Sequence, residues 1–124
     1  MPRVLHVLDH SLPLHSGYTF RTRAILKSQI GASWEARGLT GVRQYQHGKQ
    51  PDGDLEEAEG LLFFRTSHLV SGPSGLREWR EIRALERRII DVHREWPFDI
   101  VHAHSPALNG LAADRAAARL GLPF

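Results

Sequence analysis

The pattern of apolar and polar positions divides the chain into alternating strands and helices. Val4 to Leu8 form a short apolar run, which is typical of a strand buried on both faces. Residues 9–17 are polar and broken by proline and glycine, and the residues from Tyr18 onwards can form a helix that ends near Gly31, where glycine can supply a left-handed cap. A strand, a polar glycine-containing loop and a helix form the opening unit of a parallel α/β sheet.

Three further strands follow from the pattern. Residues 33–40 are ambiguous, because their first half alone would extend a helix, but their position before a turn favours a strand. Residues 42–59 are rich in polar and turn-forming residues and predict a long loop. Short apolar segments at 61–66 and 99–104, each bounded by turn residues, predict the third and fourth strands.

Two more helices are expected in the second half of the chain. Apolar side chains recur every three or four residues from Leu76 to Trp96, which predicts an amphipathic helix. Its polar face is rich in arginine and fits either a solvated surface over a core-facing stripe or a basic surface that meets an anionic membrane. Residues 106–120 are rich in alanine and predict a last helix, with Ser105 as its N-cap and Gly121 just beyond its end.

This order of elements predicts an α/β fold with a Rossmann-like, doubly wound parallel sheet of strand order about 3-2-1-4-5. Residues 122–124 resemble the start of a fifth strand. We therefore expect residues 1–124 to form one domain of a longer protein.

In this strand order, strands 1 and 4 lie side by side, so the loops at their carboxyl ends face one crevice. Polar groups that converge at such a point form the default binding site. Gly17 can let a phosphate approach the backbone, where the amides of the first helical turn can bind it, although the chain has neither a dinucleotide fingerprint nor a P-loop. The two loops supply Asp9, His10, Ser16, Gly17, His104, Ser105 and Asn109.

Three histidines lie in or next to the predicted strands. His102 and His104 are two residues apart and project from the same face. Because two histidines at this spacing without a third ligand nearby are poor evidence for a metal site, we expect no metal. His104 lies at the end of its strand, where a side chain can reach a ligand, whereas His102 and His6 are interpreted as structural.

Composition narrows the function classes. A net charge of +2 leaves no basic footprint for nucleic acid. The chain has no cysteine and no run of about eighteen apolar residues, so neither a disulfide framework nor a membrane span is predicted. These features agree with a cytoplasmic protein, and the arginine-rich helix at 76–96 offers a surface for peripheral contact with the inner membrane face.

Two segments carry a resemblance to a known family. Residues 4–23, VLHVLDHSLPLHSGYTFRTR, are similar to the start of the family-four retaining glycosyltransferases, which have the GT-B fold. Residues 99–106, DIVHAHSP, resemble the fourth-strand motif of the same family in the expected place. More narrowly, the chain resembles the branch associated with exosortase (PEP-CTERM) and exopolysaccharide gene clusters.

The resemblance implies an enzyme with two Rossmann-like domains, of which this chain is the amino-terminal, acceptor-side half. The carboxyl-terminal, donor-binding domain with its paired glutamates is not among these residues. The implied reaction transfers a hexosyl group from a nucleotide sugar to a lipid-linked or polysaccharide acceptor, retains the anomeric configuration and needs no metal or other cofactor. The half represented here is expected to be inactive alone, because half of the transition-state contacts are missing.

The resemblance also implies roles for individual residues. Gly17, with Ser16 beside it, approaches the donor diphosphate, although many family members have two glycines at this point. His104 contacts the transferred sugar near the reaction centre and is the expected catalytic residue. The expected acceptor-binding residues are Asp9, His10, Tyr18, Ser105 and Asn109.

Two other interpretations stay open. A GT-B nucleotide-sugar epimerase also pairs two such domains, and it would release free nucleotide and an altered sugar without an acceptor. A stand-alone flavodoxin-like binding domain has the same order of elements. A coding sequence that continues into a second α/β domain with two glutamates would favour the transferase.

Overall fold

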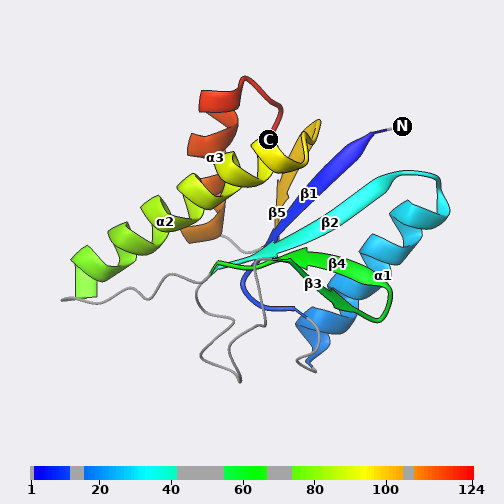
Figure 1. Ribbon diagram of the computed structural model, residues 1–124. Coiled ribbons are helices and arrows are strands. Elements are labelled where there is room, and N and C mark those ends of the chain that lie inside the picture. Colours follow the sequence, from blue (N-terminus) through cyan, green and yellow to red (C-terminus); the bar gives the residue numbers. More distant parts are fainter. Residues whose placement is uncertain (1, 12–15, 42–54, 67–73, 105–107) are drawn as a thin grey trace.

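The computed structural model describes residues 2–11, 16–41, 55–66, 74–104 and 108–124. A five-stranded sheet lies between helices on its two faces (Figure 1). The elements, in chain order, are β1 (Arg3–Leu8), α1 (Gly17–Gly31), β2 (Glu35–Thr40), β3 (Leu55–Ala58), β4 (Leu61–Phe64), α2 (Ser74–Glu95), β5 (Ile100–Ala103) and α3 (Leu108–Leu120).

The strand order across the sheet is β3-β4-β2-β1-β5, in which β3 is antiparallel to β4 and the other pairs are parallel. The α/β class with a mostly parallel sheet is therefore confirmed. The predicted order of about 3-2-1-4-5 was wrong, because an edge strand from a segment assigned to a loop joins the sheet beside β4. The predicted neighbours of β1 are confirmed, since β2 pairs with one side of it and β5 with the other.

The edge strand β3 forms a tight hairpin with β4. The connecting residues Glu59 and Gly60 have φ angles of 52° and 79°. Two consecutive positive φ angles are typical of a type I′ turn, whose twist matches that of the strands it joins. Sequence analysis missed β3 because its two glutamates lower its strand propensity. One of them, Glu56, is stabilised in the sheet by an ion pair of 2.7 Å with Arg65.

Side chains alternate along β1 and so build one core on each face of the sheet. Leu5 and Val7 belong to the larger core, which α2 and α3 cover. Leu8 belongs to the core on the opposite face, where Leu26 of α1 covers the sheet. The side chain of His6 also points to the α1 side, since it contacts Gln29 of that helix. This alternation decides which side chains of β1 can reach the candidate site.

The ends of α1 are set by local hydrogen bonds. Ser16 caps its start by accepting the N–H of Thr19 at 3.1 Å, and the hydroxyl oxygen of Thr19 accepts the N–H of Ser16 at 2.9 Å. The predicted left-handed cap at Gly31 was wrong, because Ser33, with a φ of 70°, takes that conformation instead. At the end of α3 the prediction is confirmed, since Gly121 has a φ of 70°.

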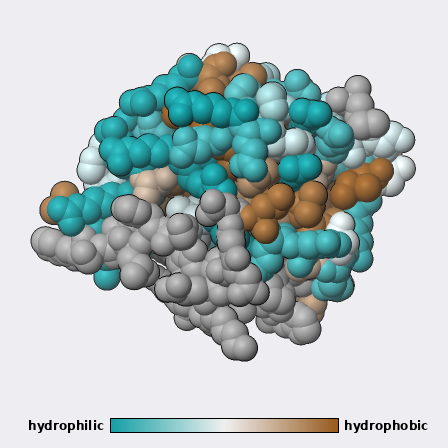
Figure 2. Space-filling model, viewed as in Figure 1, coloured by the Kyte–Doolittle hydropathy of each residue, from teal (hydrophilic) through white to brown (hydrophobic). Residues whose placement is uncertain are grey.

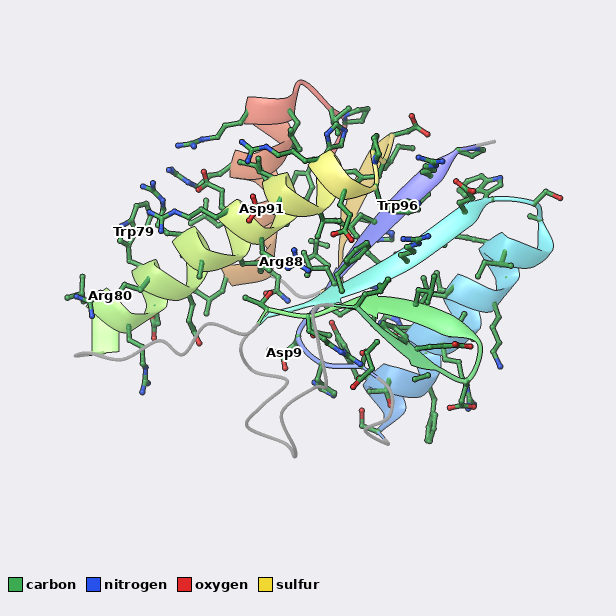
Figure 3. All side chains as sticks on the ribbon, viewed as in Figure 1. Asp9, Trp79, Arg80, Arg88, Asp91 and Trp96 are labelled. Carbon is green, nitrogen blue, oxygen red and sulfur yellow. The ribbon has the colours of Figure 1, made fainter. Side chains whose placement is uncertain are left out.

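The helix α2 buries most of its predicted apolar stripe. Leu76 and Trp79, however, are 45% and 42% exposed, because the first turns of α2 extend past the edge of the sheet (Figure 1). The surface along α2 is largely hydrophilic, as the charged face predicts (Figure 2). Not every arginine faces solvent, since Nε of Arg88 donates to the backbone oxygen of Arg65 at 2.9 Å (Figure 3). No helix in the described part of the chain is long and apolar enough to cross a membrane.

Candidate functional site

The carboxyl ends of β1 and β5 lie side by side and define the candidate site. The two strands pair in parallel up to Val7 and Ala103, and the backbone N–H of His104 donates to the oxygen of Val7 at 3.0 Å. The segments that leave these strands therefore begin next to each other. Asp9 and His104, at which the two predicted loops begin, lie at this edge of the sheet, as the predicted pairing of these strands requires.

The segment after β1 carries a chain of polar contacts that ends at the start of α1. Nδ1 of His10 lies 3.0 Å from Oδ2 of Asp9, and Nε2 of His10 lies 3.1 Å from the hydroxyl oxygen of Ser16. When Nδ1 donates to the carboxylate, Nε2 is left to accept the Ser16 hydroxyl hydrogen. This arrangement leaves the Ser16 oxygen free to accept from Thr19, which is the capping bond of the helix.

Tyr18 closes this group from the first turn of α1. Its hydroxyl oxygen accepts the backbone N–H of Asp9 at 3.1 Å, and its ring lies 4.7 Å from that of His10, centroid to centroid. Four of the predicted site residues, Asp9, His10, Ser16 and Tyr18, thus form one connected cluster.

Gly17 lies at the first position of α1 and is exposed. A Cβ atom built on Gly17 would meet no atom within 4 Å. The first turn of α1 contains no acidic residue, so the positive end of the helix dipole is not neutralised by its own side chains. These are the conditions under which a helix N-terminus binds an anion.

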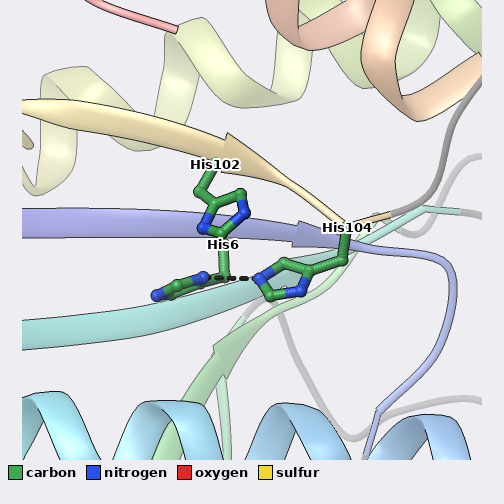
Figure 4. Close-up of side chains that lie close together, drawn as sticks. All are labelled: His6, His102 and His104. Carbon is green, nitrogen blue, oxygen red and sulfur yellow. Dashed lines mark hydrogen bonds between the residues drawn. The ribbon is translucent and has the colours of Figure 1, made fainter.

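Three histidines gather on the α1 side of the sheet (Figure 4). His6 of β1 and His102 of β5 are register partners, and His104 follows two residues later. Nδ1 of His6 lies 2.7 Å from Nε2 of His104, and Nε2 of His6 lies 2.6 Å from Oε1 of Gln29 in α1. His6, interpreted from the sequence as a structural residue, is therefore in direct contact with the predicted catalytic residue.

The contacts define which nitrogens carry hydrogen. Oε1 of Gln29 can only accept, so Nε2 of His6 carries the hydrogen and Nδ1 holds a lone pair. That lone pair accepts from Nε2 of His104, which leaves Nδ1 of His104 as an acceptor. This Nδ1 is buried and has no hydrogen-bond partner among the described residues.

Burial is the main cause that lowers the pKa values of His6 and His104. Burial lowers the pKa of His6. For His104, burial is the largest cause, and the nearby His6, His102 and Arg21 add to it, so that its pKa falls to about 4. At neutral pH His104 is therefore an uncharged hydrogen-bond acceptor at the carboxyl end of β5.

The two remaining predicted residues follow β5. Asn109, in the first turn of α3, is 8% exposed, and its side-chain nitrogen has no hydrogen-bond partner in the described part of the protein. Ser105 lies outside the described residues. The structure thus brings together Asp9, His10, Ser16 and Tyr18 around the start of α1, and places His104 on the adjoining strand.

Arg65 was not among the predicted site residues, although it holds Ser11, two positions after Asp9, by a hydrogen bond. Its side chain is 1% exposed and donates to the hydroxyls of Ser11 at 2.6 Å and Thr40 at 3.2 Å. It also pairs with Glu56 at 2.7 Å. A charged residue directly after an apolar strand was the available signal. Its partners, up to 54 positions away, could not be read from the sequence.

A hollow lies at the opposite end of the sheet from these residues. It is lined mainly by residues at the amino ends of β2 and β4, including Trp34, Ala36 and Leu62. Ligands of parallel α/β sheets bind at the carboxyl ends of the strands. The candidate site is therefore the edge that carries Asp9 and His104 (Figure 3 shows Asp9 at the end of β1).

The comparisons with known proteins identify the family of the chain. Residues 16–124 match a family model described as a glycosyl transferase 4-like domain. Neither the comparison with curated proteins nor that with solved structures gave a match. The family match covers most of the chain and includes α1, β5 and His104, and we conclude that this chain belongs to the glycosyl transferase 4-like domain family.

Proposed function

We propose that this chain is the acceptor-side domain of a retaining glycosyltransferase. The reaction transfers a hexosyl group from a nucleotide sugar to a lipid-linked or polysaccharide acceptor, in the branch associated with exosortase and exopolysaccharide gene clusters. Membership of the family supports the transferase class. The observation that carries the proposal is that β1 and β5 end side by side, so that His104 lies at the edge of the sheet from which the chain leads to the capped start of α1.

Ser16 and Gly17 are proposed to meet the donor phosphates. The helix dipole favours an anion at this point, and the missing side chain of Gly17 lets phosphate oxygens approach the backbone amides. Because the Ser16 side chain already caps the helix, it holds this turn in shape before the donor arrives.

His104 is proposed to contact the transferred sugar. Its Nδ1 is a buried acceptor without a partner among the described residues, and a sugar hydroxyl is a donor that would satisfy it. The acceptor is proposed to bind over Asp9, His10 and Tyr18, with Ser105 and Asn109 as further contacts. Transfer is proposed to need no metal cofactor, so it should continue in the presence of a chelator.

The test uses Gly17→Ala in the full-length protein. Since a Cβ here meets nothing within 4 Å, the variant should fold normally, and Gly31→Ala at the end of the same helix is a matched control with equal space. We expect Gly17→Ala to raise KM for the nucleotide sugar about tenfold or more, because the new methyl group displaces the phosphate. An unchanged KM would show that the donor phosphates do not bind at this turn.

The same assay separates the transferase from the epimerase. Product should form only with an added glycan or lipid-linked acceptor, and free nucleotide should appear in equal amount. Release of nucleotide and an altered sugar without any acceptor would contradict the proposed transfer.

The start of α2 is proposed to touch an anionic membrane surface. Leu76 and Trp79 are exposed there, and the guanidinium groups of Arg83 and Arg115 lie 6.0 and 5.2 Å from the Trp79 ring. Apolar and cationic side chains together suit the boundary between lipid headgroups and acyl chains. Flotation with vesicles that contain anionic lipid should carry the protein up the gradient, and Trp79→Ser should weaken this; equal flotation with neutral vesicles would contradict it.

A further inference from the structure

We propose that His6, His102 and His104 form a binding site for a divalent transition metal ion, Zn²⁺ above all, and that the bound ion inhibits transfer. The metal site rests only on the geometry of the three side chains. The inhibition rests in addition on the proposed role of His104.

The three histidines are placed by the sheet itself. His6 and His102 occupy opposed positions on neighbouring parallel strands, and His104 is two residues further along the same face. Each ring offers a nitrogen atom, and these nitrogens all lie within 4.8 Å of one another. The sequence around His102 and His104 contains no third ligand. In the fold, His6 of β1, from the other end of the sequence, supplies it.

The distances suit a tetrahedral ion. Zinc–nitrogen bonds of about 2.0–2.1 Å place two ligand nitrogens of one ion about 3.4 Å apart. The nitrogens of His6 and His104 are 2.7 Å apart and need to separate by less than about 1 Å, whereas the widest pair, within 4.8 Å, needs to close by up to about 1.4 Å. His102 is the most exposed of the three, and three protein ligands leave one position of a tetrahedral ion for water or another ligand.

The neighbour of His6 prepares it as a ligand. Gln29 accepts the hydrogen on Nε2 at 2.6 Å, which leaves the Nδ1 lone pair directed at the cluster. A hydrogen bond of this kind, from the nitrogen that does not bind the metal, fixes the ring and raises its basicity at metal sites. The structure thus contains three ligands and a second-shell acceptor for one of them.

The ligand type selects the metal. Three imidazoles suit Zn²⁺, Co²⁺, Ni²⁺ and Cu²⁺, whereas Mg²⁺ prefers oxygen ligands. The site is therefore distinct from a magnesium site for nucleotide phosphates, and millimolar Mg²⁺ should not compete for it.

Metal binding would change the chemistry of His104. In the metal-free arrangement Nε2 of His104 donates to His6, and Nδ1 is the acceptor proposed for the sugar hydroxyl. When the ion takes the lone pair of Nε2, the ring of a neutral histidine must carry its hydrogen on Nδ1 instead. No proton is gained or lost overall, but the substrate-facing atom changes from acceptor to donor, so a sugar hydroxyl can no longer donate to it.

The first experiment measures binding to the purified 124-residue chain. Zn²⁺ is titrated in competition with a chromophoric chelator, and Co²⁺ is followed by the visible absorption that a tetrahedral site produces. We expect one ion per chain, no effect of Mg²⁺, and an affinity at least about tenfold lower in His102→Ala. His102→Ala is the variant of choice because this side chain is exposed and its loss leaves the core intact.

His93→Ala is the matched control, since this histidine of α2 contacts Phe98 on the other side of the sheet. An equal affinity in wild type and His102→Ala, or a loss of affinity in His93→Ala as large as in His102→Ala, would overturn the site. Far-UV circular dichroism of each variant checks that its fold is unchanged.

The second experiment adds Zn²⁺ to the full-length enzyme under transfer conditions. Zn²⁺ should abolish transfer at the concentrations that fill the site, a chelator should restore it, and His102→Ala should shift the inhibition curve at least about tenfold. Stoichiometric binding without inhibition would refute the inhibitory part alone. The KM of Gly17→Ala for the nucleotide sugar, by contrast, tests the proposed function without involving the metal.

Discussion

The imidazole rings of His6 and His104 are in hydrogen-bond contact, 2.7 Å from Nδ1 to Nε2, although 98 positions separate the two residues in the chain. The contact exists because β1 and β5 are neighbours with His6 opposite His102. Together with the bond from His6 to Gln29, it sets the hydrogen on Nε2 of His104 and leaves Nδ1 as an acceptor.

Removing the His104 ring should abolish most transfer while leaving the fold intact. In His104→Ala the proposed acceptor for the sugar hydroxyl is gone, and we expect kcat to fall about 100-fold or more. The ring is only partly buried, so thermal unfolding should change little. Wild-type rates in His104→Ala, with normal rates in the control His93→Ala, would remove His104 from the site.

The free energy of unfolding should fall as the pH is lowered. An unfolded histidine binds a proton with a pKa of about 6.5, whereas the pKa of His104 in the fold is about 4. Between these values the unfolded chain holds more protons, so stability rises with pH across this window and is lost as pH falls through it. His6, whose pKa is also lowered, acts in the same direction.

Urea unfolding of the chelator-treated protein between pH 7 and pH 4 measures this effect. His104→Gln removes one titrating group and should flatten the dependence relative to wild type. A wild-type protein whose stability is independent of pH over this window would show that these histidines are not held neutral by the fold.

The sequence predicted the parts of the fold whose signals are local. The apolar runs of β1, β4 and β5 and the amphipathic period of α2 each express burial within a few residues, and the pairing of β1 with β5 followed from the common winding of such sheets. From that pairing alone the site was placed at the ends of the strands near Asp9 and His104.

The parts that were missed depend on contacts between distant residues. Glu56 disfavours a strand until Arg65 pairs with it, so β3 appears only once the hairpin exists. His6 could not be connected with His104, because the distance between them follows from the register of two strands rather than from any period in the sequence. Arg65 and Ser11 are likewise joined only in the fold.

Replacing Arg65 should destabilise the domain and disturb the candidate site together. Arg65→Met keeps much of the apolar stem but leaves Glu56 without its cation and the hydroxyls of Ser11 and Thr40 without their donor. Breaking a buried ion pair costs about 3–5 kcal/mol, and we expect the lower end because Glu56 is 25% exposed.

Chemical denaturation of Arg65→Met, Glu56→Gln and the double variant would measure the coupling between the two side chains. Glu56→Gln retains an acceptor oxygen for the guanidinium and should cost only about 1 kcal/mol. Additive effects in the double variant would contradict a direct interaction between Arg65 and Glu56.

The close approach of β2 to its neighbours leaves little space for a side chain at Gly38. A Cβ atom on Gly38 would lie 2.5 Å from Cδ1 of Phe63 and 3.2 Å from Cδ1 of Leu8. Phe63 is 1% exposed and has no room to move away, so Gly38→Ala should destabilise the domain by about 1–3 kcal/mol through overpacking.

Gly31→Ala, whose Cβ meets nothing within 4 Å, should be neutral or stabilise α1 by about 0.5–1 kcal/mol. Equal urea midpoints for the two variants would show that the contact between β2 and β4 is looser than the structure indicates. Because Leu8 leads directly into Asp9, Gly38→Ala should also weaken acceptor binding under conditions in which the domain remains folded.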